Sequence, residues 1–299
     1  MIATDNAKIA KNLNIQFVKE LSNSFKLDEL SAIICSRAFA AKLLNLDTPN
    51  LRLIQLTSAG YEGVDVELAK SKSIQICNAA DVYNVGMAEF VVHAILMRAK
   101  RYNHSIKNRG LRPFRNYQYI TELMGKTVGI LGTGNIGSQI AKRLEAFDMQ
   151  VLGYDLQNSD RPYFKKVYSQ ETLKEFLGEC DYIVNCIPLF RSTEGMLCKA
   201  WFDLMKDNVT IVNVGRQKIF NERDFIKFLK SHKDATAILD MFEKFPNPIT
   251  NPYRRLSNVL VLPGVTAISQ EIDIKLQKLC KRNIDALNSN KELINTLWK

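Results

Sequence analysis

The sequence is short of histidine and has no closely spaced cysteines. Only three of its 299 residues are histidines, His93, His104 and His232, and none of its six cysteines forms a Cys-x-x-Cys pair. These features argue against a zinc site and against a disulfide-stabilised fold, so we predict no metal and expect buried, reduced thiols. The shortage of histidine also leaves few side chains that exchange a proton near neutral pH.

The sequence also shows neither a signal peptide nor a long apolar run. Its opening residues do not have the basic-then-apolar pattern of a secretory signal. The best candidate for a membrane span, residues 87–97, is interrupted by Glu89 and His93 and is much shorter than a bilayer requires. The sequence therefore predicts a cytoplasmic protein that does not enter a membrane.

Acidic residues are fewer than basic ones, 31 against 41, and the formal net charge is +10. Nucleic acid or an acidic substrate would suit that charge. The lysines are scattered, however, and the local cluster of Arg109, Arg112 and Arg115 is short. We therefore expect a solvated basic surface and no nucleic-acid partner. The cluster leaves a phosphorylated small substrate open.

What the sequence does have is an alternation of short apolar runs and longer amphipathic segments. Runs rich in Val, Ile and Leu, such as 30–37 and 126–134, have the length of strands buried on both faces. Segments such as 136–147 and 221–232 have the apolar spacing of helices, and Asn221 can cap the second. The pattern predicts an α/β protein with parallel, doubly wound sheets, and its length suits two domains.

One segment has the pattern of a dinucleotide-binding turn. Its Gly-x-Gly-x-x-Gly sequence lies between an apolar strand and a helix, and the next strand ends in an aspartate 18 residues after the last glycine. The glycines permit a tight turn, a close approach to a diphosphate, and close packing of helix on strand. The aspartate suits ribose hydroxyls and repels a 2′-phosphate, which favours NAD over NADP. A glycine-rich turn of another α/β protein is the alternative. The predicted NAD site comprises Gly132, Gly134, Asn135, Ile136, Gly137 and Asp155.

Most of the chain also resembles the D-isomer-specific 2-hydroxyacid dehydrogenases. The similarity runs, in the order found in that family, through QLTSAGYEGVD, ELMGKTVGILGTGNIG, NCIPLFRSTEG, NVGRQKIFNERDF and NVLVLPG. The resemblance implies two Rossmann-like domains with the substrate in a cleft between them. The substrate-binding domain would be residues 1–95 plus 273–299, and the NAD-binding domain residues 96–272. The resemblance also implies a homodimer, for which the apolar segment 87–97 is a suitable interface.

The same resemblance implies further site residues. Arg216, after the strand IVNVG, matches the catalytic arginine of the family, whose planar fork can hold the carboxylate and carbonyl oxygens of a 2-keto acid together. The backbone N–H groups of Ala59 and Gly60 would contribute to carboxylate binding. Pro188 would line the adenine pocket, and Asp240 would lie near the nicotinamide carboxamide. The implied activity is reduction of a 2-keto acid or oxidation of a D-2-hydroxy acid.

The sequence departs from the family at the two positions of its acid–base pair. The glutamate position falls on Phe245 and the histidine position on Gly264. No histidine follows His232, so a shifted alignment does not recover one. A positioned acid typically contributes about a hundredfold to ten-thousandfold to a rate, so the loss is serious. The two substitutions are compatible with each other, because the Phe245 ring could fill the space of an imidazole above Gly264.

Two functions are open at this point. The first is an NAD-dependent oxidoreductase acting on a small 2-keto or 2-hydroxy acid, whose proton comes from water, Lys244 or the substrate itself. The second is a catalytically degenerate NAD(H)-binding module that serves as a sensor or scaffold. The nucleotide and arginine positions favour the first function, and the missing acid–base pair favours the second.

Overall fold

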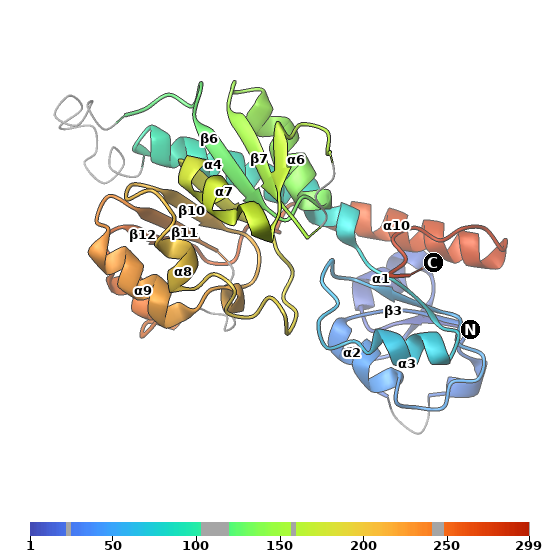
Figure 1. Cartoon of the computed structure of the whole chain (residues 1–299). Coiled ribbons are helices and arrows are strands. Elements are labelled where there is room, and N and C mark those ends of the chain that lie inside the picture. The colour runs from blue at the N-terminus through green and yellow to red at the C-terminus, as the bar shows by residue number, and fades with distance from the viewer. Residues whose placement is uncertain (22–24, 103–119, 157–159, 241–247, 299) are drawn as a thin grey trace. The chain divides into compact units, whose positions relative to one another are not determined.

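The computed structural model describes residues 1–21, 25–102, 120–156, 160–240 and 248–298. The chain divides into two compact units, residues 1–83 with 269–299 and residues 84–268. Each unit is a parallel β-sheet with helices on both faces (Figure 1), so the predicted α/β class with doubly wound sheets is confirmed. The expected domain limits at 95/96 and 272/273 both fall inside helices, and the domain assignment stays a prediction.

The first unit is built on a five-stranded sheet in the order β2-β1-β3-β4-β5. Its strands are β1 (Ile2–Thr4), β2 (Gln16–Phe17), β3 (Ala32–Cys35), β4 (Leu53–Leu56) and β5 (Gln75–Cys77). Its helices are α1 (Ala7–Leu13), α2 (Arg37–Leu43), α3 (Val66–Ser71) and α10 (Ile272–Asn288). Side chains of α2 and α3 pack on one face of the sheet, and those of α1 and α10 pack on the other. Every residue of β3 and β4 is therefore buried, as expected for strands covered on both sides.

The C-terminal segment returns to this first sheet and bonds to it. The side-chain amide of the buried Asn283 in α10 donates to Oε1 of Gln55 at 2.6 Å and to the carbonyl of Ile294 at 3.0 Å. Its own oxygen accepts the N–H of Ile294 at 2.8 Å, and Leu297 donates to the carbonyl of Ile76 at 2.9 Å. Because buried amides are costly unless hydrogen-bonded, this network holds the segment in one register against the sheet.

The second unit has a seven-stranded sheet in the order β12-β11-β10-β9-β6-β7-β8. Its strands are β6 (Thr127–Leu131), β7 (Gln150–Tyr154), β8 (Lys166–Tyr168), β9 (Tyr182–Asn185), β10 (Thr210–Asn213), β11 (Thr236–Leu239) and β12 (Val259–Val261). Its helices are α4 (Ala80–Ala99), which begins in the last residues of the first unit, α6 (Asn135–Glu145), α7 (Leu173–Glu179), α8 (Lys199–Phe202) and α9 (Glu222–Ser231). Asn221 caps α9 as predicted, since its side chain accepts the N–H of Asp224.

Helices α7, α8 and α9 lie on one face of this sheet (Figure 1), and an aromatic core joins them to it. Phe202 stacks on both Phe225 and Phe228 with ring centroids 5.3 Å apart. Tyr154, the last residue of β7, meets Trp201 edge-on at 5.2 Å. Aromatic pairs of this kind are each worth about 0.5–1.5 kcal/mol beyond the area they bury. The packing of Tyr154 therefore anchors the end of the strand that carries Asp155.

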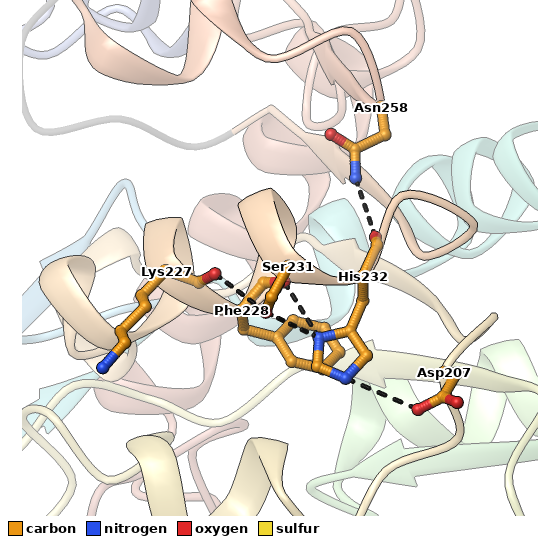
Figure 2. A network of polar contacts seen from close by, with 6 residues as sticks. All are labelled: Asp207, Lys227, Phe228, Ser231, His232 and Asn258. Atoms are coloured by element: carbon orange, nitrogen blue, oxygen red, sulfur yellow. Dashed lines mark hydrogen bonds and ion pairs between the residues drawn. The ribbon is translucent and has the colours of Figure 1, made fainter.

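His232 lies at the end of α9, in a polar cluster that caps the helix. Its Nδ1 is 2.9 Å from Oγ of Ser231 and 3.1 Å from the carbonyl of Phe228, and its Nε2 is 3.4 Å from Asp207 (Figure 2). The Ser231 hydroxyl also lies 3.0 Å from the Phe228 carbonyl, and Asn258 donates to the His232 carbonyl at 3.2 Å. These bonds satisfy the last carbonyls of the helix, so the serine, histidine and aspartate form a helix cap rather than a nucleophilic triad. His232 precedes β11 and thus lies at the amino edge of the sheet.

Helix α4 is longer than the sequence suggests. The expectation that every apolar stretch is too short to cross a bilayer is wrong on length, because α4 begins at Ala80 and continues for 20 residues through Asn84 and Gly86. With a mean hydropathy of 1.2, it is the one helix of the described ranges that is long and apolar enough to span a membrane. One third of its most apolar 18-residue stretch is buried within the protein. Core helices of globular domains have the same length and composition.

Candidate nucleotide-binding site

The candidate site lies at the carboxyl ends of β6 and β9. The chain adds β7 and β8 on one side of β6 and then returns to add β9 on the other, which makes this pair the switch point of the sheet. Open parallel sheets usually bind their ligands at such a point. The pairing of β6 with β9 continues past the end of β9, because the backbone N–H of Cys186 donates to the carbonyl of Leu131 at 2.9 Å. A Cβ on Gly132 would lie 3.3 Å from the Cys186 backbone.

The three glycines of the turn differ in what surrounds them. Gly132 has a φ of +91°, which side chains rarely permit, and it makes the tight turn. A Cβ on Gly137 would lie 2.0 Å from the carbonyl oxygen of Gly132, so α6 can pack on the turn only without a side chain there. A Cβ on Gly134 would meet no atom within 4 Å, so that side of the turn is open. Gly134 is the N-cap of α6 and supplies no side-chain cap, an arrangement that suits a diphosphate.

Asp155 lies beside this turn and is hydrogen-bonded to it. Its Oδ2 accepts both the N–H of Thr133 at 2.8 Å and the Thr133 hydroxyl at 2.7 Å. Its Oδ1 accepts the N–H of Leu156 at 2.8 Å. Parallel pairing of β6 with β7, with Leu131 opposite Tyr154, brings the two loops together. The carboxylate is thus held in a defined orientation at the edge where the sequence predicts a ribose.

A buried pair of asparagines shapes the neighbouring loops, and the sequence analysis did not identify it. Asn185 and Asn213 end β9 and β10 in register, and Nδ2 of Asn185 donates to Oδ1 of Asn213 at 2.8 Å. Their side-chain oxygens accept the N–H groups of Ile187 and Gly215, each at 3.2 Å. These bonds set the courses of the segments that lead to Pro188 and Arg216. The repeated Ile-Val-Asn in the two strands is the signal that marks the pair.

Pro188 and Arg216 follow these two strands on the same edge of the sheet. Pro188 is exposed, and its carbonyl accepts the hydroxyl of Thr193 at 2.8 Å. Arg216 is half-buried, and its carbonyl accepts the N–H of Ile219 in the short helix that begins at Gln217. Because the carboxyl ends of β6, β9 and β10 are adjacent, the glycine turn, Pro188 and Arg216 belong to one edge of the second unit.

Asp240, at the end of β11, anchors the loop after β12. Its Oδ1 accepts the N–H groups of Gly264 at 2.9 Å and Val265 at 3.0 Å, and its Oδ2 accepts the N–H of Thr266 at 2.7 Å. The Thr266 hydroxyl also donates to Oδ2. A carboxylate offers about four acceptor positions, so this fully buried group is saturated. Asp240 therefore fixes the shape of the loop instead of presenting an open acceptor.

The loop that Asp240 anchors contains Gly264, the residue at the position of the histidine in the family that the sequence resembles. Gly264 has a φ of +79°, in the left-handed region that favours glycine. The backbone conformation of this loop therefore favours glycine at position 264 over a residue with a side chain. Phe245 and Lys244, like the arginine cluster at 109–115, lie outside the described residues.

In the first unit, the loop after β4 contains Ala59 and Gly60. Its carbonyl groups are used internally: Tyr83 donates to the carbonyl of Thr57 at 2.6 Å and Asn78 to that of Ala59 at 2.8 Å. Among the described residues, none accepts the N–H of Ala59 or Gly60. Both residues are half-exposed, so their N–H groups suit an anionic ligand.

The thiol at the switch point is not a reactive group. Burial raises the pKa of Cys186 to about 12, so the sulfur stays protonated at neutral pH and is a poor nucleophile and metal ligand. Within the ranges that the structure describes, no group of three His, Cys, Asp or Glu side chains could hold a metal ion.

Comparison with known proteins accords with this architecture. Residues 90–265 match the family model described as "D-isomer specific 2-hydroxyacid dehydrogenase, NAD binding domain". A D-3-phosphoglycerate dehydrogenase of Archaeoglobus fulgidus is 29% identical over 79% of the chain, and the match spans only 45% of that longer protein. A glyoxylate reductase of Pyrococcus furiosus is 29% identical over 80% of the chain and 74% of its own length.

A solved structure supports the fold independently. An acyclic imino acid reductase in complex with NADPH and D-Arg superposes with a TM-score of 0.85 over the full length of both chains, at 20% identity. The match to the family model covers more than half of the chain and includes the glycine turn, Asp155, Arg216 and Asp240. This protein therefore belongs to the D-isomer-specific 2-hydroxyacid dehydrogenase family and contains that family's NAD-binding domain.

Proposed function

We propose that the protein is an NAD-dependent oxidoreductase that interconverts a small 2-keto acid and the corresponding 2-hydroxy acid. The observation that carries the proposal is the open glycine turn at the switch point, with Asp155 held beside it. The turn is suited to the diphosphate, the opening residues Asn135 and Ile136 to its oxygens, and Asp155 to a ribose hydroxyl. Bound NAD supplies the hydride acceptor, and NADH the donor.

In this proposal Arg216 binds the substrate carboxylate and polarises the carbonyl, and the N–H groups of Ala59 and Gly60 contribute to carboxylate binding. Pro188 lines the adenine pocket. Asp240 lies near the nicotinamide carboxamide and acts through the loop that it anchors, because its acceptor positions are filled.

The proton for ketone reduction has a non-standard source in this proposal. Gly264 stands at the histidine position, and its φ of +79° disfavours any replacement side chain. Water, Lys244 or the substrate itself would supply the proton. If no source suffices, the protein is the alternative, a degenerate NAD(H)-binding module.

A second candidate substrate class follows from the same loop. The solved relative named as an imino acid reductase shares this fold, and imines suit a site without a strong acid. Hydride addition to a protonated imine forms a C–H bond and moves the π electrons of the C=N bond onto nitrogen. The product is a neutral amine, so no proton from the protein is required. We infer that a 2-keto acid presented with an amine is a better substrate than the keto acid alone.

One experiment separates these functions. NADH oxidation is followed with a panel of 2-keto acids, phosphorylated members included, with and without ammonium or methylamine, beside a fluorescence titration of NADH binding. Turnover that Arg216→Ala abolishes while NADH still binds supports the oxidoreductase, and dependence on the amine supports the imine. Binding without turnover across the panel, also in Phe245→Glu with Gly264→His, supports the binding module. No binding of either NAD or NADH by the folded protein rejects all three.

We also propose a cytoplasmic homodimer formed through the segment 87–97. Half-buried apolar side chains such as Phe90 and Leu96 lie on this part of α4 and support the interface. Light scattering after size exclusion tests it: a monomeric mass at micromolar concentration would contradict the proposal.

A further inference from the structure

We propose that Thr133 is the positioning residue that locks Asp155 toward the adenosine ribose, and that this lock sets the preference for NAD over NADP. The inference rests on the proposed nucleotide site and adds a residue to it. Thr133 lies between the first two glycines of the turn, at a position that the Gly-x-Gly-x-x-Gly pattern leaves unspecified.

Thr133 occupies half of the acceptor positions of the Asp155 carboxylate. Oδ2 of Asp155 accepts two bonds from Thr133, at 2.8 Å from the N–H and 2.7 Å from the hydroxyl, which fills both of its acceptor positions. Oδ1 accepts the N–H of Leu156 at 2.8 Å and retains one position. The geometry therefore offers a single acceptor, in one direction, to a ribose hydroxyl.

Thr133 itself cannot turn. It is only 1% exposed, and its methyl carbon packs against Gly153 of β7, where a Cβ would lie 2.6 Å away. Its carbonyl accepts the hydroxyl of Ser138 at 3.0 Å, which ties the turn to α6. With the methyl and the backbone both fixed, the hydroxyl has one direction, and that direction is toward Asp155.

A fixed Asp155 carboxylate repels the 2′-phosphate of NADP. A free aspartate side chain could rotate about its χ1 bond and move its charge away from a phosphate that carries nearly two negative charges. Two hydrogen bonds from a buried threonine oppose that rotation, and bonds to a charged acceptor are about twice as strong as neutral ones. The Asp155 carboxylate therefore stays in place, and rotation does not relieve its repulsion of the 2′-phosphate.

The test uses ADP-ribose and its 2′-phosphate as probes, with dissociation constants measured by calorimetry. Thr133→Val keeps the methyl group and replaces the hydroxyl with a second methyl. We expect it to weaken ADP-ribose binding about tenfold, the equivalent of about 1.4 kcal/mol and near the worth of one charge-assisted bond. The selectivity against the 2′-phosphate should fall by a similar factor. Thr133→Ser retains the hydroxyl and loses only the methyl, so it should keep more of the wild-type selectivity than Thr133→Val, which makes it the matched control.

A double-mutant cycle with Asp155→Ala separates positioning from packing. If Thr133 acts through Asp155, Thr133→Val changes neither affinity nor selectivity in the Asp155→Ala background. An equal loss in both backgrounds, or unchanged selectivity in Thr133→Val alone, overturns the proposal. If Thr133→Val does not fold, Thr133→Ala, which also removes the hydroxyl, is compared with Thr133→Ser in both backgrounds, and the alanine should lose selectivity only where Asp155 is present. Failure of folded wild type to bind ADP-ribose would instead reject the nucleotide site itself.

Discussion

Two alanine substitutions in the glycine turn should have opposite effects on folding and on binding. Gly137→Ala should destabilise the protein, because the new Cβ would lie 2.0 Å from the Gly132 carbonyl oxygen. Gly134→Ala should leave the fold intact and weaken nucleotide binding, because its Cβ meets no protein atom within 4 Å and would occupy the space assigned to the diphosphate. The pair tests the turn with the same chemical change at two positions.

The magnitudes follow from these contacts. A carbon and a carbonyl oxygen normally approach no closer than about 3.3 Å, so α6 has to move by roughly 1 Å in Gly137→Ala. Overpacking by one methyl typically costs about 1–3 kcal/mol, and the upper end applies because the contact is with backbone. Gly134 has φ −69° and ψ −159°, which any residue adopts, so its substitution should raise the free energy of unfolding by about 0.4–1 kcal/mol.

Urea unfolding followed by circular dichroism measures the first effect, and NADH titration measures the second. We expect Gly134→Ala to bind NADH about tenfold more weakly or worse, equivalent to at least about 1.4 kcal/mol, with an unchanged or higher urea midpoint. An unchanged midpoint for Gly137→Ala would refute the close approach of α6 to the turn. Wild-type affinity in Gly134→Ala would refute the placement of the diphosphate.

Three further predictions concern the loop after β12 and the buried thiols. Gly264→His should lose about 1–2 kcal/mol of stability from its left-handed backbone, with Gly264→Asn less affected, and equal melting temperatures for histidine, asparagine and wild type would contradict this. Asp240→Asn replaces two acceptor positions with an amide that donates, so its free energy of unfolding should fall by about 2–4 kcal/mol in urea, and an unshifted midpoint would contradict the anchor. Burial raises the pKa values of Cys77 and Cys280 from 9.0 to about 12, so the folded state keeps protons that the unfolded chain releases above pH 9. The thiols should therefore not lower the free energy of unfolding below pH 9, and between pH 9 and 12 each should lower it by up to about 1.4 kcal/mol per pH unit. The fall should be less steep in Cys280→Ala. A free energy of unfolding that stays constant up to pH 11 would contradict this prediction.

The nucleotide turn was predictable because its constraints are local. The positive φ of Gly132 and the close packing at Gly137 follow from residues next to one another in sequence. Long apolar strands such as β6 are equally visible, because burial on both faces leaves a run of Val, Ile and Leu. By contrast, the two exposed residues of β2 and the three residues of β8 are too short to carry a pattern.

Contacts between distant segments were not predictable. The sequence identifies Asp240 and Gly264 separately, but the bonds between them depend on the pairing of β11 with β12. The same holds for Thr133 with Asp155 and for Asn185 with Asn213, which meet only across neighbouring strands. Helix α4 is longer than expected because its first turns contain Asn84 and Gly86, which weaken the apolar pattern without ending the helix.

The return of the C-terminal segment to the first sheet has a consequence for the order of events during synthesis. Residues 84–268 form a contiguous unit that can fold once they have left the ribosome. The hydrogen-bond partner of the Gln55 amide, Asn283, is synthesised more than two hundred residues later, and so is Leu297, the partner of the Ile76 carbonyl. Throughout that interval the N-terminal sheet lacks α10, which packs with α1 on one of its faces, so apolar side chains on that face stay uncovered in the nascent chain.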